Sequence, residues 1–200
     1  MEEEKKLLFI VDPQYDFING SLPVPNADIA MDALCDYLKD NVENYAAVVI
    51  SLDWHPWMHC SFDSYENPET GERGQWPRHC VMHSRGAAVW DRLLEVLDGT
   101  DVYMLNKGYQ PDKEEYSLLQ CQESTFTFRN IMSEYEINDV DFCGIVREIC
   151  VMNTMKDFMK MYEEVNVRVL LDYTPTLDGG VEFDKFLENH LEVLTVKSAI

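Results

Sequence analysis

The sequence predicts an α/β domain with a doubly wound, mostly parallel sheet of about six strands and helices on both faces. Short apolar runs, which are typical of strands buried on both faces, alternate along the chain with segments whose apolar residues recur every three or four positions. Such alternation favours a parallel sheet, because right-handed crossovers place the helices on its two faces. The predicted strands are residues 7–11, 46–50, 102–105, 140–145, 165–171 and 192–196.

Helical periodicity accounts for the segments between these strands. Apolar stripes predict helices near residues 29–38, 89–97, 151–162 and 181–191. The first stripe begins at Ile29, Asn26 is a suitable N-cap for that helix, and Gly99 is a suitable stop for the second helix. The polar stretch 63–78 is too long for a plain connection, and long loops in compact domains are usually functional.

The composition limits the partners and the location that we expect. With 16 Lys+Arg and 37 Asp+Glu among 200 residues, the formal net charge at pH 7 is −21, which excludes most nucleic-acid partners because phosphates require a basic surface. No run of about 18 apolar residues occurs, so no membrane partner is expected. The run 7–11 is too short for a signal-peptide core, which predicts a cytoplasmic protein. The length predicts a single domain over residues 1–200, and a homo-oligomer is left open.

Reactive side chains follow four of the predicted strands. Asp12 ends the first strand, Asp53 and His55 follow the second, Lys107 ends the third, and Cys150 opens the helix after the fourth. In open α/β sheets the ligand binds beyond the carboxyl ends of the strands. One crevice is therefore expected to collect two carboxylates, an imidazole, an ammonium group and a thiol.

Cys150 is the candidate nucleophile of this crevice. At the first turn of a helix, unpaired backbone N–H groups favour a thiolate, and Lys107 acts in the same direction. Asp12 is interpreted as the base that takes the thiol proton and returns it to a leaving group. Taken singly, Asp12 is also typical of a strand-end cap and Lys107 of a solvated side chain, so the prediction depends on the combination. Cysteines in predicted core elements are interpreted as buried thiols, namely Cys35, Cys121 and Cys143.

A second group of side chains is typical of a metal site. Asp53 and His55 are two residues apart, so on an extended strand they point to the same side, as two ligands of one ion do. His79 is the leading candidate for a third ligand, followed by His59 and His83. This ligand set favours one divalent metal, with Zn²⁺ first and Mn²⁺ or Fe²⁺ as alternatives. Two other interpretations stay open: histidines that are only hydrogen-bonded, and a closed zinc site formed by His59, Cys60, Cys80 and His83.

Neither a Gly-x-Gly-x-x-Gly pattern after the first strand nor a Walker loop occurs, so nucleotide sites have no support.

Five segments, taken in order, resemble one known family. The five segments are residues 11–17, 53–62, 76–81, 107–108 and 144–151, within a match that covers about residues 7–175. They resemble the isochorismatase-like cysteine hydrolases, and within these the nicotinamidase and pyrazinamidase branch. The resemblance implies the fold of that family.

The resemblance also implies a role for each site residue. The implied sets are Asp12, Lys107 and Cys150 as a catalytic triad, and Asp53, His55 and His79 as metal ligands. The backbone N–H groups of Val146 and Cys150 are expected to form an oxyanion hole, which in this family depends on a cis peptide bond before Val146. Phe17 and Trp76 flank the two groups and are expected to stack on a flat ring of a small-molecule amide substrate.

The activity that the resemblance implies is a metal-dependent cysteine amidase, which hydrolyses nicotinamide to nicotinate and ammonia through a thioester in NAD salvage. Two alternatives stay open: an amide or carbamoyl hydrolase of the same family with another substrate, and a non-catalytic binding protein on this fold. The second alternative depends on one difference, because Val146, Arg147 and Glu148 stand where the family usually has a small residue followed by Thr-Asp. Isochorismatase itself is disfavoured, since its relatives lack the cysteine and the metal ligands.

Overall fold

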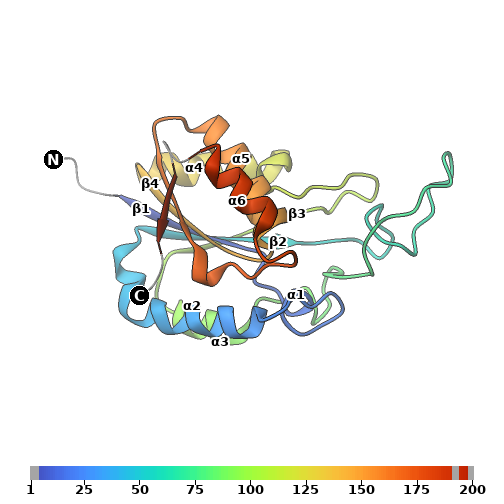
Figure 1. Ribbon diagram of the computed structural model, residues 1–200, viewed down its shortest axis with the longest axis horizontal. Helices are drawn as coiled ribbons and strands as arrows, with labels where there is room; N and C mark the ends of the chain where they lie inside the picture. Colours follow the sequence, from blue (N-terminus) through green and yellow to red (C-terminus); the bar gives the residue numbers. More distant parts are fainter. Residues whose placement is uncertain (1–4, 191–193, 198–200) are drawn as a thin grey trace.

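The centre of the molecule is a six-stranded sheet in which all neighbouring strands run parallel (Figure 1). The computed structural model describes residues 5–190 and 194–197. The strand order is β3-β2-β1-β4-β5-β6, so the direction of winding reverses between β1 and β4, the place where doubly wound sheets bind ligands. This architecture confirms the predicted fold class. The strands are β1 (Lys6–Val11), β2 (Ala47–Asp53), β3 (Val102–Lys107), β4 (Asp139–Gly144), β5 (Asn166–Leu170) and β6 (Leu194–Lys197).

Helices cover both faces of this sheet (Figure 1). One layer holds α2 (Ala27–Asn41) and α3 (Asp91–Val96), and the other holds α4 (Gln122–Glu134), α5 (Met152–Met161) and α6 (Val181–Glu188). Alternate residues of β1 pack into the two layers, Leu8 and Ile10 with the first and Phe9 and Val11 with the second. Burial on both faces is the reason why this strand reads as an uninterrupted apolar run.

Some elements differ from the sequence-based predictions. The prediction that the β3 run is buried on both faces is wrong, because β3 is an edge strand and Met104 is 46% exposed. The predicted helices do not include α4. Ile29 is exposed rather than part of the buried stripe of α2, which starts with Ala27 and Ala30. Asn26 does stand at the N-cap of α2, but its side chain makes no capping hydrogen bond.

The predicted closing strand is only partly within the described residues. Positions 194–196 belong to β6, whereas positions 192 and 193 lie outside the part of the chain that the structure describes.

Long segments without regular structure extend beyond the carboxyl ends of β2 and β3 (Figure 1). We call residues 54–90 the arm; its outer part contains the polar stretch 63–78. Isolated parallel bridges join His55 to Val81 and Phe62 to Trp76, so the outgoing and returning halves of the arm lie side by side. The short helix α1 (Tyr15–Ile18) follows β1 at the same end of the sheet. These segments surround the carboxyl edge, where a ligand is expected.

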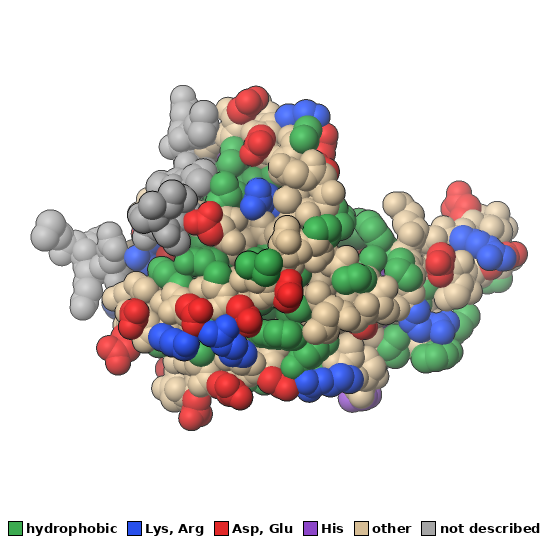
Figure 2. All heavy atoms as spheres, turned by 60° about the horizontal axis from the view of Figure 1, so that its bottom comes forward, with side chains coloured by type: hydrophobic (Ala, Val, Ile, Leu, Met, Phe, Trp, Pro, Cys, Tyr) green, Lys and Arg blue, Asp and Glu red, His purple; other side chains and the backbone are tan. Residues whose placement is uncertain are grey.

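The face formed by α2 and α3 carries charges of both signs (Figure 2). Arg92 of α3, for example, makes ion pairs with Asp32 and Asp36 of α2. The excess of acidic residues is therefore interrupted by basic ones on this face. Among the helices within residues 5–190 and 194–197, none is long and apolar enough to cross a membrane.

Candidate active site

The ends of four strands bring the predicted site residues together. Asp12 follows β1, which stops because Asp12 adopts a left-handed φ of 47° and Pro13 has no N–H to donate. Asp53 and Lys107 are the last residues of β2 and β3 and are paired in the register of the sheet. Cys150 follows β4, in the helical turn Arg147–Val151 (η3) that continues into α5. The predicted convergence at the carboxyl edge is therefore present.

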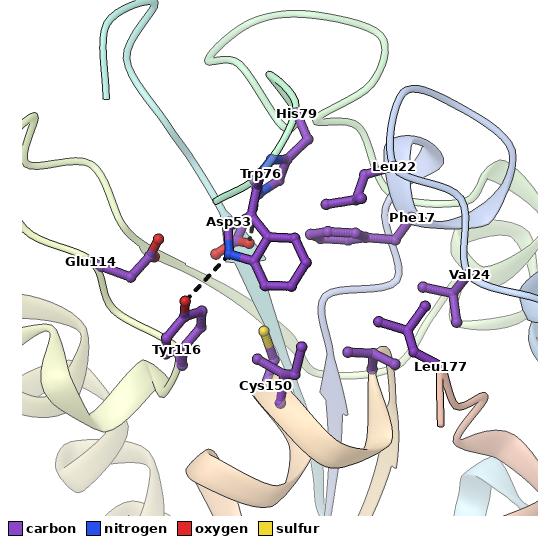
Figure 3. Close-up of a pocket in the computed structure, with 12 residues that line it drawn as sticks. Phe17, Leu22, Val24, Asp53, Trp76, His79, Glu114, Tyr116, Cys150 and Leu177 are labelled. Carbon is purple, nitrogen blue, oxygen red and sulfur yellow. Dashed lines mark hydrogen bonds and ion pairs between the residues drawn. The ribbon is translucent and has the colours of Figure 1, made fainter. Parts of the chain in front are cut away.

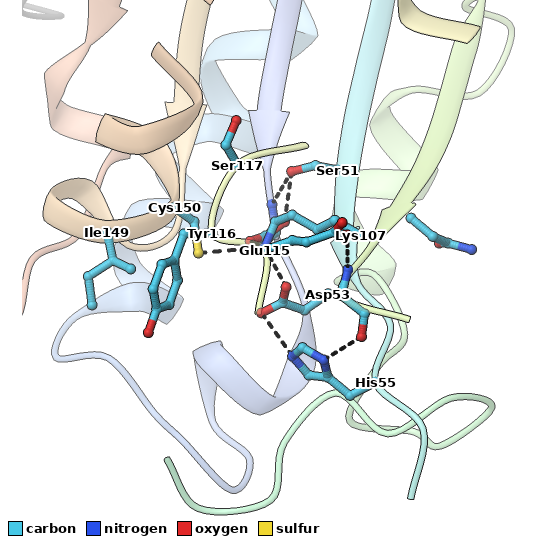
Figure 4. Close-up of polar contacts among 12 residues, drawn as sticks. Ser51, Asp53, His55, Lys107, Glu115, Tyr116, Ser117, Ile149 and Cys150 are labelled. Carbon is cyan, nitrogen blue, oxygen red and sulfur yellow. Dashed lines mark hydrogen bonds and ion pairs between the residues drawn. The ribbon is translucent and has the colours of Figure 1, made fainter. Parts of the chain in front are cut away.

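Lys107 is the centre of a buried polar cluster (Figure 4). Its Nζ lies 2.8 Å from Asp12 Oδ2, contacts Asp53 Oδ1, and donates to Cys150 Sγ over 3.7 Å. Ser51 of β2 donates to Asp12 Oδ1 at 2.7 Å, which leaves Oδ2 to face Lys107 and the thiol. Asp12 and Lys107 have no exposed surface, so water does not weaken these interactions.

Burial and charge set the protonation of this cluster. Burial acts to lower the pKa of Lys107, but the carboxylates of Asp12 and Asp53 raise it well above its usual value, so the ammonium keeps its charge. Burial raises the pKa of Cys150 well above that of a free thiol, and Lys107 opposes this only in part. The pKa of Asp12 is also raised by burial, against the attraction of Lys107.

Burial therefore opposes the expected thiolate at Cys150. Cys150 does lie in the first turn of the helical segment, as predicted, but only 6% of its surface is exposed. Burial raises the pKa of the thiol more than the neighbouring Lys107 ammonium lowers it, because burial penalises the charged form of the thiol directly. A base that removes the thiol proton is therefore needed near the sulfur.

Asp53, His55 and His79 have the chemistry and the arrangement of a divalent-metal site. His55 Nδ1 donates to the carbonyl of Gly108 at 2.8 Å, and His79 Nδ1 donates to the carbonyl of Pro77 at 2.7 Å. Because a carbonyl only accepts, both Nε2 atoms carry free lone pairs. They lie 3.6 Å and 3.7 Å from Asp53 Oδ2, and the three donor atoms all lie within 4.8 Å of one another.

An orphaned nitrogen supports this assignment. His55 Nε2 is buried and has no hydrogen-bond partner within the described chain, which is costly unless something occupies its lone pair. Burial alone would raise the pKa of Asp53, but the Lys107 ammonium holds it well below its usual value, so this ligand is an anion. The three residues therefore fit a divalent metal.

The other histidines of the arm do not join this group. His59 is buried, and both ring nitrogens are used: Nδ1 accepts from Ser61 Oγ at 2.7 Å, and Nε2 donates to the carbonyl of Lys113 at 3.1 Å. Burial lowers its pKa to about 4. His83 packs edge-on against Trp54, with ring centroids 5.3 Å apart. Within the described residues, the closed zinc site of His59, Cys60, Cys80 and His83 is not formed.

A pocket opens above Cys150, and its two sides differ in polarity (Figure 3). Glu114 and Tyr116 lie on one side. Trp76 lies across the pocket and donates through Nε1 to Tyr116 Oη at 3.3 Å. Asp53 and His79 also line it, which joins the metal ligands to the space above the thiol. The opposite side is apolar and consists of Phe17, Leu22, Val24 and Leu177.

Several contributors to the site were not predicted. Gln14 clamps the end of β2, because its side chain accepts from the Asp53 N–H at 2.8 Å and donates to the Asp53 carbonyl at 2.7 Å. Its signal was its position inside segment 11–17, two residues after Asp12. Glu114, whose pKa is raised by burial, had no such signal, since one glutamate in an acidic chain does not stand out.

The turn before Cys150 shows where the chain departs from the family pattern. The peptide bond between Ile145 and Val146 is cis, as the resemblance implies. Arg147 donates through Nε to the Thr174 carbonyl at 2.8 Å. Glu148 accepts from the backbone N–H of Leu177 at 2.6 Å. Both unusual side chains therefore engage the segment that follows β5.

Comparison with individual relatives identifies the family, although no family model matches the chain. A nicotinamidase of Escherichia coli is 30% identical over 176 residues, which are 81% of this chain and 80% of the relative. A pyrazinamidase of Pyrococcus horikoshii, crystallised in complex with zinc, superposes with a TM-score of 0.76 at 29% identity, covering 97% of this chain and 99% of that one. For the yeast nicotinamidase bound to the inhibitor nicotinaldehyde, the TM-score is 0.80 at 25% identity, with 96% and 99% covered.

Fold and site together are those of an amidohydrolase with the isochorismatase-like fold. The similarity extends over most of each chain and includes the relative from Escherichia coli. The chain belongs to the nicotinamidase family.

Proposed function

We propose that this protein hydrolyses nicotinamide to nicotinate and ammonia, a step of NAD salvage, with a zinc ion held by Asp53, His55 and His79. The observation that carries the proposal is the position of Cys150. Its Sγ lies at one end of a pocket, 3.7 Å from Lys107 Nζ, and the wall of the same pocket includes Asp53 and His79. A pyridine carboxamide has a reactive carbonyl, which suits attack by the Cys150 thiol, and a ring nitrogen, which suits a metal held by the ligands in the pocket wall.

The first half of the reaction transfers the acyl group to sulfur. Asp12 accepts the thiol proton as Cys150 Sγ attacks the carboxamide carbon and forms the C–S bond. The ammonium of Lys107 stabilises the negative charge that passes from sulfur to oxygen, and the N–H groups of Val146 and Cys150 hold the oxyanion. Asp12 then returns the proton to the nitrogen, the C–N bond breaks, and ammonia leaves a thioester behind.

The second half releases the acid. Asp12, again a carboxylate, takes a proton from a water molecule, whose oxygen attacks the thioester carbon. The C–S bond breaks, Asp12 returns its proton to sulfur, and the acid leaves and loses its remaining proton to water as nicotinate. The buried Asp12 suits this exchange, because burial raises the pKa of its carboxyl towards that of a group that both gives and takes protons.

The remaining residues of the pocket position the ring. When bound, zinc supplies a Lewis-acidic position for the pyridine nitrogen. The choice of zinc is supported by the zinc complex of the related pyrazinamidase from Pyrococcus horikoshii. Phe17 and Trp76 contact the ring, and Tyr116 fixes the indole of Trp76 through its hydroxyl. Holding the ring in this way fixes the carboxamide carbon against Cys150.

Ammonia release from nicotinamide by the zinc-loaded protein tests the proposal. We expect turnover that a chelator stops, and a loss of at least about 10³-fold in Cys150→Ala. Cys143→Ala is the matched control, because Cys143 is a buried core thiol of β4. Benzamide should be a poor substrate, since it keeps the shape and lacks the ring nitrogen. Absence of ammonia release, or equal rates for benzamide and nicotinamide, would refute the proposal.

A further inference from the structure

The turn that carries Cys150 is tied to the connection between β5 and α6. The connection, residues 174–180, follows the helical turn η4 (Leu171–Tyr173) and has no regular structure. The tip of this connection is formed by Leu177 and Asp178. Glu148 Oε1 accepts hydrogen bonds from the backbone N–H groups of both residues, at 2.6 Å from Leu177 and 3.1 Å from Asp178. Because the acceptor is a carboxylate, these bonds are charge-assisted.

Arg147 holds the base of the same connection. Its Nε donates to the Thr174 carbonyl at 2.8 Å, its Nη2 donates to the Leu171 carbonyl at 2.9 Å, and its backbone N–H donates to the Pro175 carbonyl at 3.0 Å. The base is therefore fixed by a partly buried network that does not involve Glu148. Among these contacts, only those to the backbone N–H groups of Leu177 and Asp178 depend on the Glu148 carboxylate. The Asp178 side chain separately accepts from the N–H groups of Gly180 and Glu182 at the start of α6.

The tip matters because Leu177 lines the pocket above Cys150. Leu177 is 47% exposed, and its side chain lies on the apolar side, opposite Glu114 and Tyr116 (Figure 3). Glu148 is two residues from Cys150 in sequence, so one turn sets the position of both the sulfur and this wall of the pocket. A tip that moved away would leave the substrate ring with its edge in water.

We propose that Glu148 is a positioning residue, which fixes Leu177 as a wall of the substrate pocket through the two backbone hydrogen bonds. This inference rests on the proposed function, because the substrate is the amide that the pocket holds. Glu148 does not touch the reacting atoms. Its effect is therefore expected on substrate binding, through Leu177, rather than on the chemical step.

Four variants separate this role from a merely structural one. Glu148→Ala should raise KM for nicotinamide about three- to tenfold, the change expected from partial loss of one leucine contact, and should change kcat less than about twofold. Leu177→Ala should give the same change, and the double variant should be no worse than either, because both remove one wall. Glu148→Gln keeps an acceptor oxygen in place and should stay within about twofold of the wild type.

Hydrogen exchange of the backbone amides of residues 174–180 supplies a readout that needs no turnover. We expect the Leu177 and Asp178 amides to exchange at least about tenfold faster in Glu148→Ala, and at a rate closer to that of the wild type in Glu148→Gln, which keeps an acceptor oxygen but loses the charge. Glu182→Ala, which removes an exposed carboxylate that pairs with Lys185 on α6, is the matched control and should change neither exchange nor KM.

The outcomes separate this proposal from the proposed function. Unchanged exchange in Glu148→Ala, faster exchange with an unchanged KM, or a glutamine variant that behaves like alanine would each overturn the role of Glu148. A wild-type protein that releases no ammonia from nicotinamide would instead refute the proposed function, and the exchange rates would still decide whether Glu148 holds the tip.

Discussion

The ammonium of Lys107 lies 2.8 Å from Asp12 Oδ2, and both side chains are completely buried. Asp53 contacts the same ammonium, so one buried cation serves two buried carboxylates. Donor atoms of Asp12, Asp53 and Cys150 lie within 4.8 Å of one another, close enough to hold a metal ion, but the Lys107 ammonium contacts all three. The cation of this second cluster is therefore supplied by the chain itself.

Removing the Lys107 charge should destabilise the fold as well as stop turnover. Lys107→Met leaves two buried carboxylates without their cation, and we expect the free energy of unfolding to fall by about 3–5 kcal/mol. Denaturant unfolding at neutral pH measures this change. Lys160→Met is the control, because the Lys160 side chain is 78% exposed and its loss should change stability by less than about 0.5 kcal/mol. Equal stabilities for the two variants would contradict a central role for the Lys107 charge.

Metal affinity should distinguish His79 from His83, although both belong to the arm. His79→Ala removes a proposed ligand, and we expect zinc affinity to fall by more than the roughly 100-fold that loss of an outer partner can cause. His83→Ala should leave it unchanged, since His83 packs against Trp54. Calorimetric titration of the metal-free proteins with zinc gives both values. Tight, stoichiometric zinc binding by His79→Ala would remove this residue from the ligand set.

Replacing Gly108 by alanine should displace His55 and weaken zinc binding. Gly108 has a φ of +68°, and a Cβ there would lie 2.5 Å from His55 Cε1. Gly99 is the matched control, since its φ is +83° and a Cβ would meet nothing within 4 Å. Alanine at either position should cost about 1–2 kcal/mol of stability through the left-handed backbone. Only Gly108→Ala should also weaken zinc binding, and equal zinc affinities in the two variants would show that His55 tolerates the displacement.

Trp76 should act on substrate binding. Trp76→Ala removes a ring contact worth about 0.5–1.5 kcal/mol, so KM for nicotinamide should rise about two- to tenfold while kcat falls less. Steady-state kinetics with nicotinamide and pyrazinamide measure the split. Tyr116→Phe removes only the hydroxyl that accepts from Trp76 Nε1 and should have a smaller effect in the same direction. A kcat effect larger than the KM effect would mean that Trp76 acts on the chemical step.

The fold was predictable where burial on both faces leaves a simple pattern. β1 and β2 are buried along almost their whole length, and both contain an uninterrupted run of apolar residues. The same logic failed at β3, because an apolar run does not reveal whether a strand has one neighbour or two. The helix α4 was not predicted either, although Phe128, Ile131 and Met132 are buried at helical spacing; Phe126, which is 68% exposed, lies off this stripe.

The site was predictable where the parallel topology alone dictates proximity. Asp12, Asp53 and Lys107 stand at strand ends, and strand ends in one parallel sheet must meet. The protonation of Cys150 was not predictable, because it depends on a degree of burial that the chain acquires only when the loops pack over it. Contacts between segments far apart in the sequence, such as that of Glu148 with Leu177, likewise could not be inferred from sequence patterns.

The metal site has a mechanical consequence for the arm. Asp53 and His55 belong to β2 and its exit, whereas His79 stands on the returning half of the arm, beyond the polar stretch that contains Arg73. An ion bound by all three would link the returning half of the arm to the sheet. It would therefore restrain residues 56–78 at both ends. Loss of the ion should then open the arm locally while the sheet stays folded. Cleavage by trypsin after Arg73 would report that loosening, so the susceptibility of one peptide bond becomes a gauge of metal occupancy.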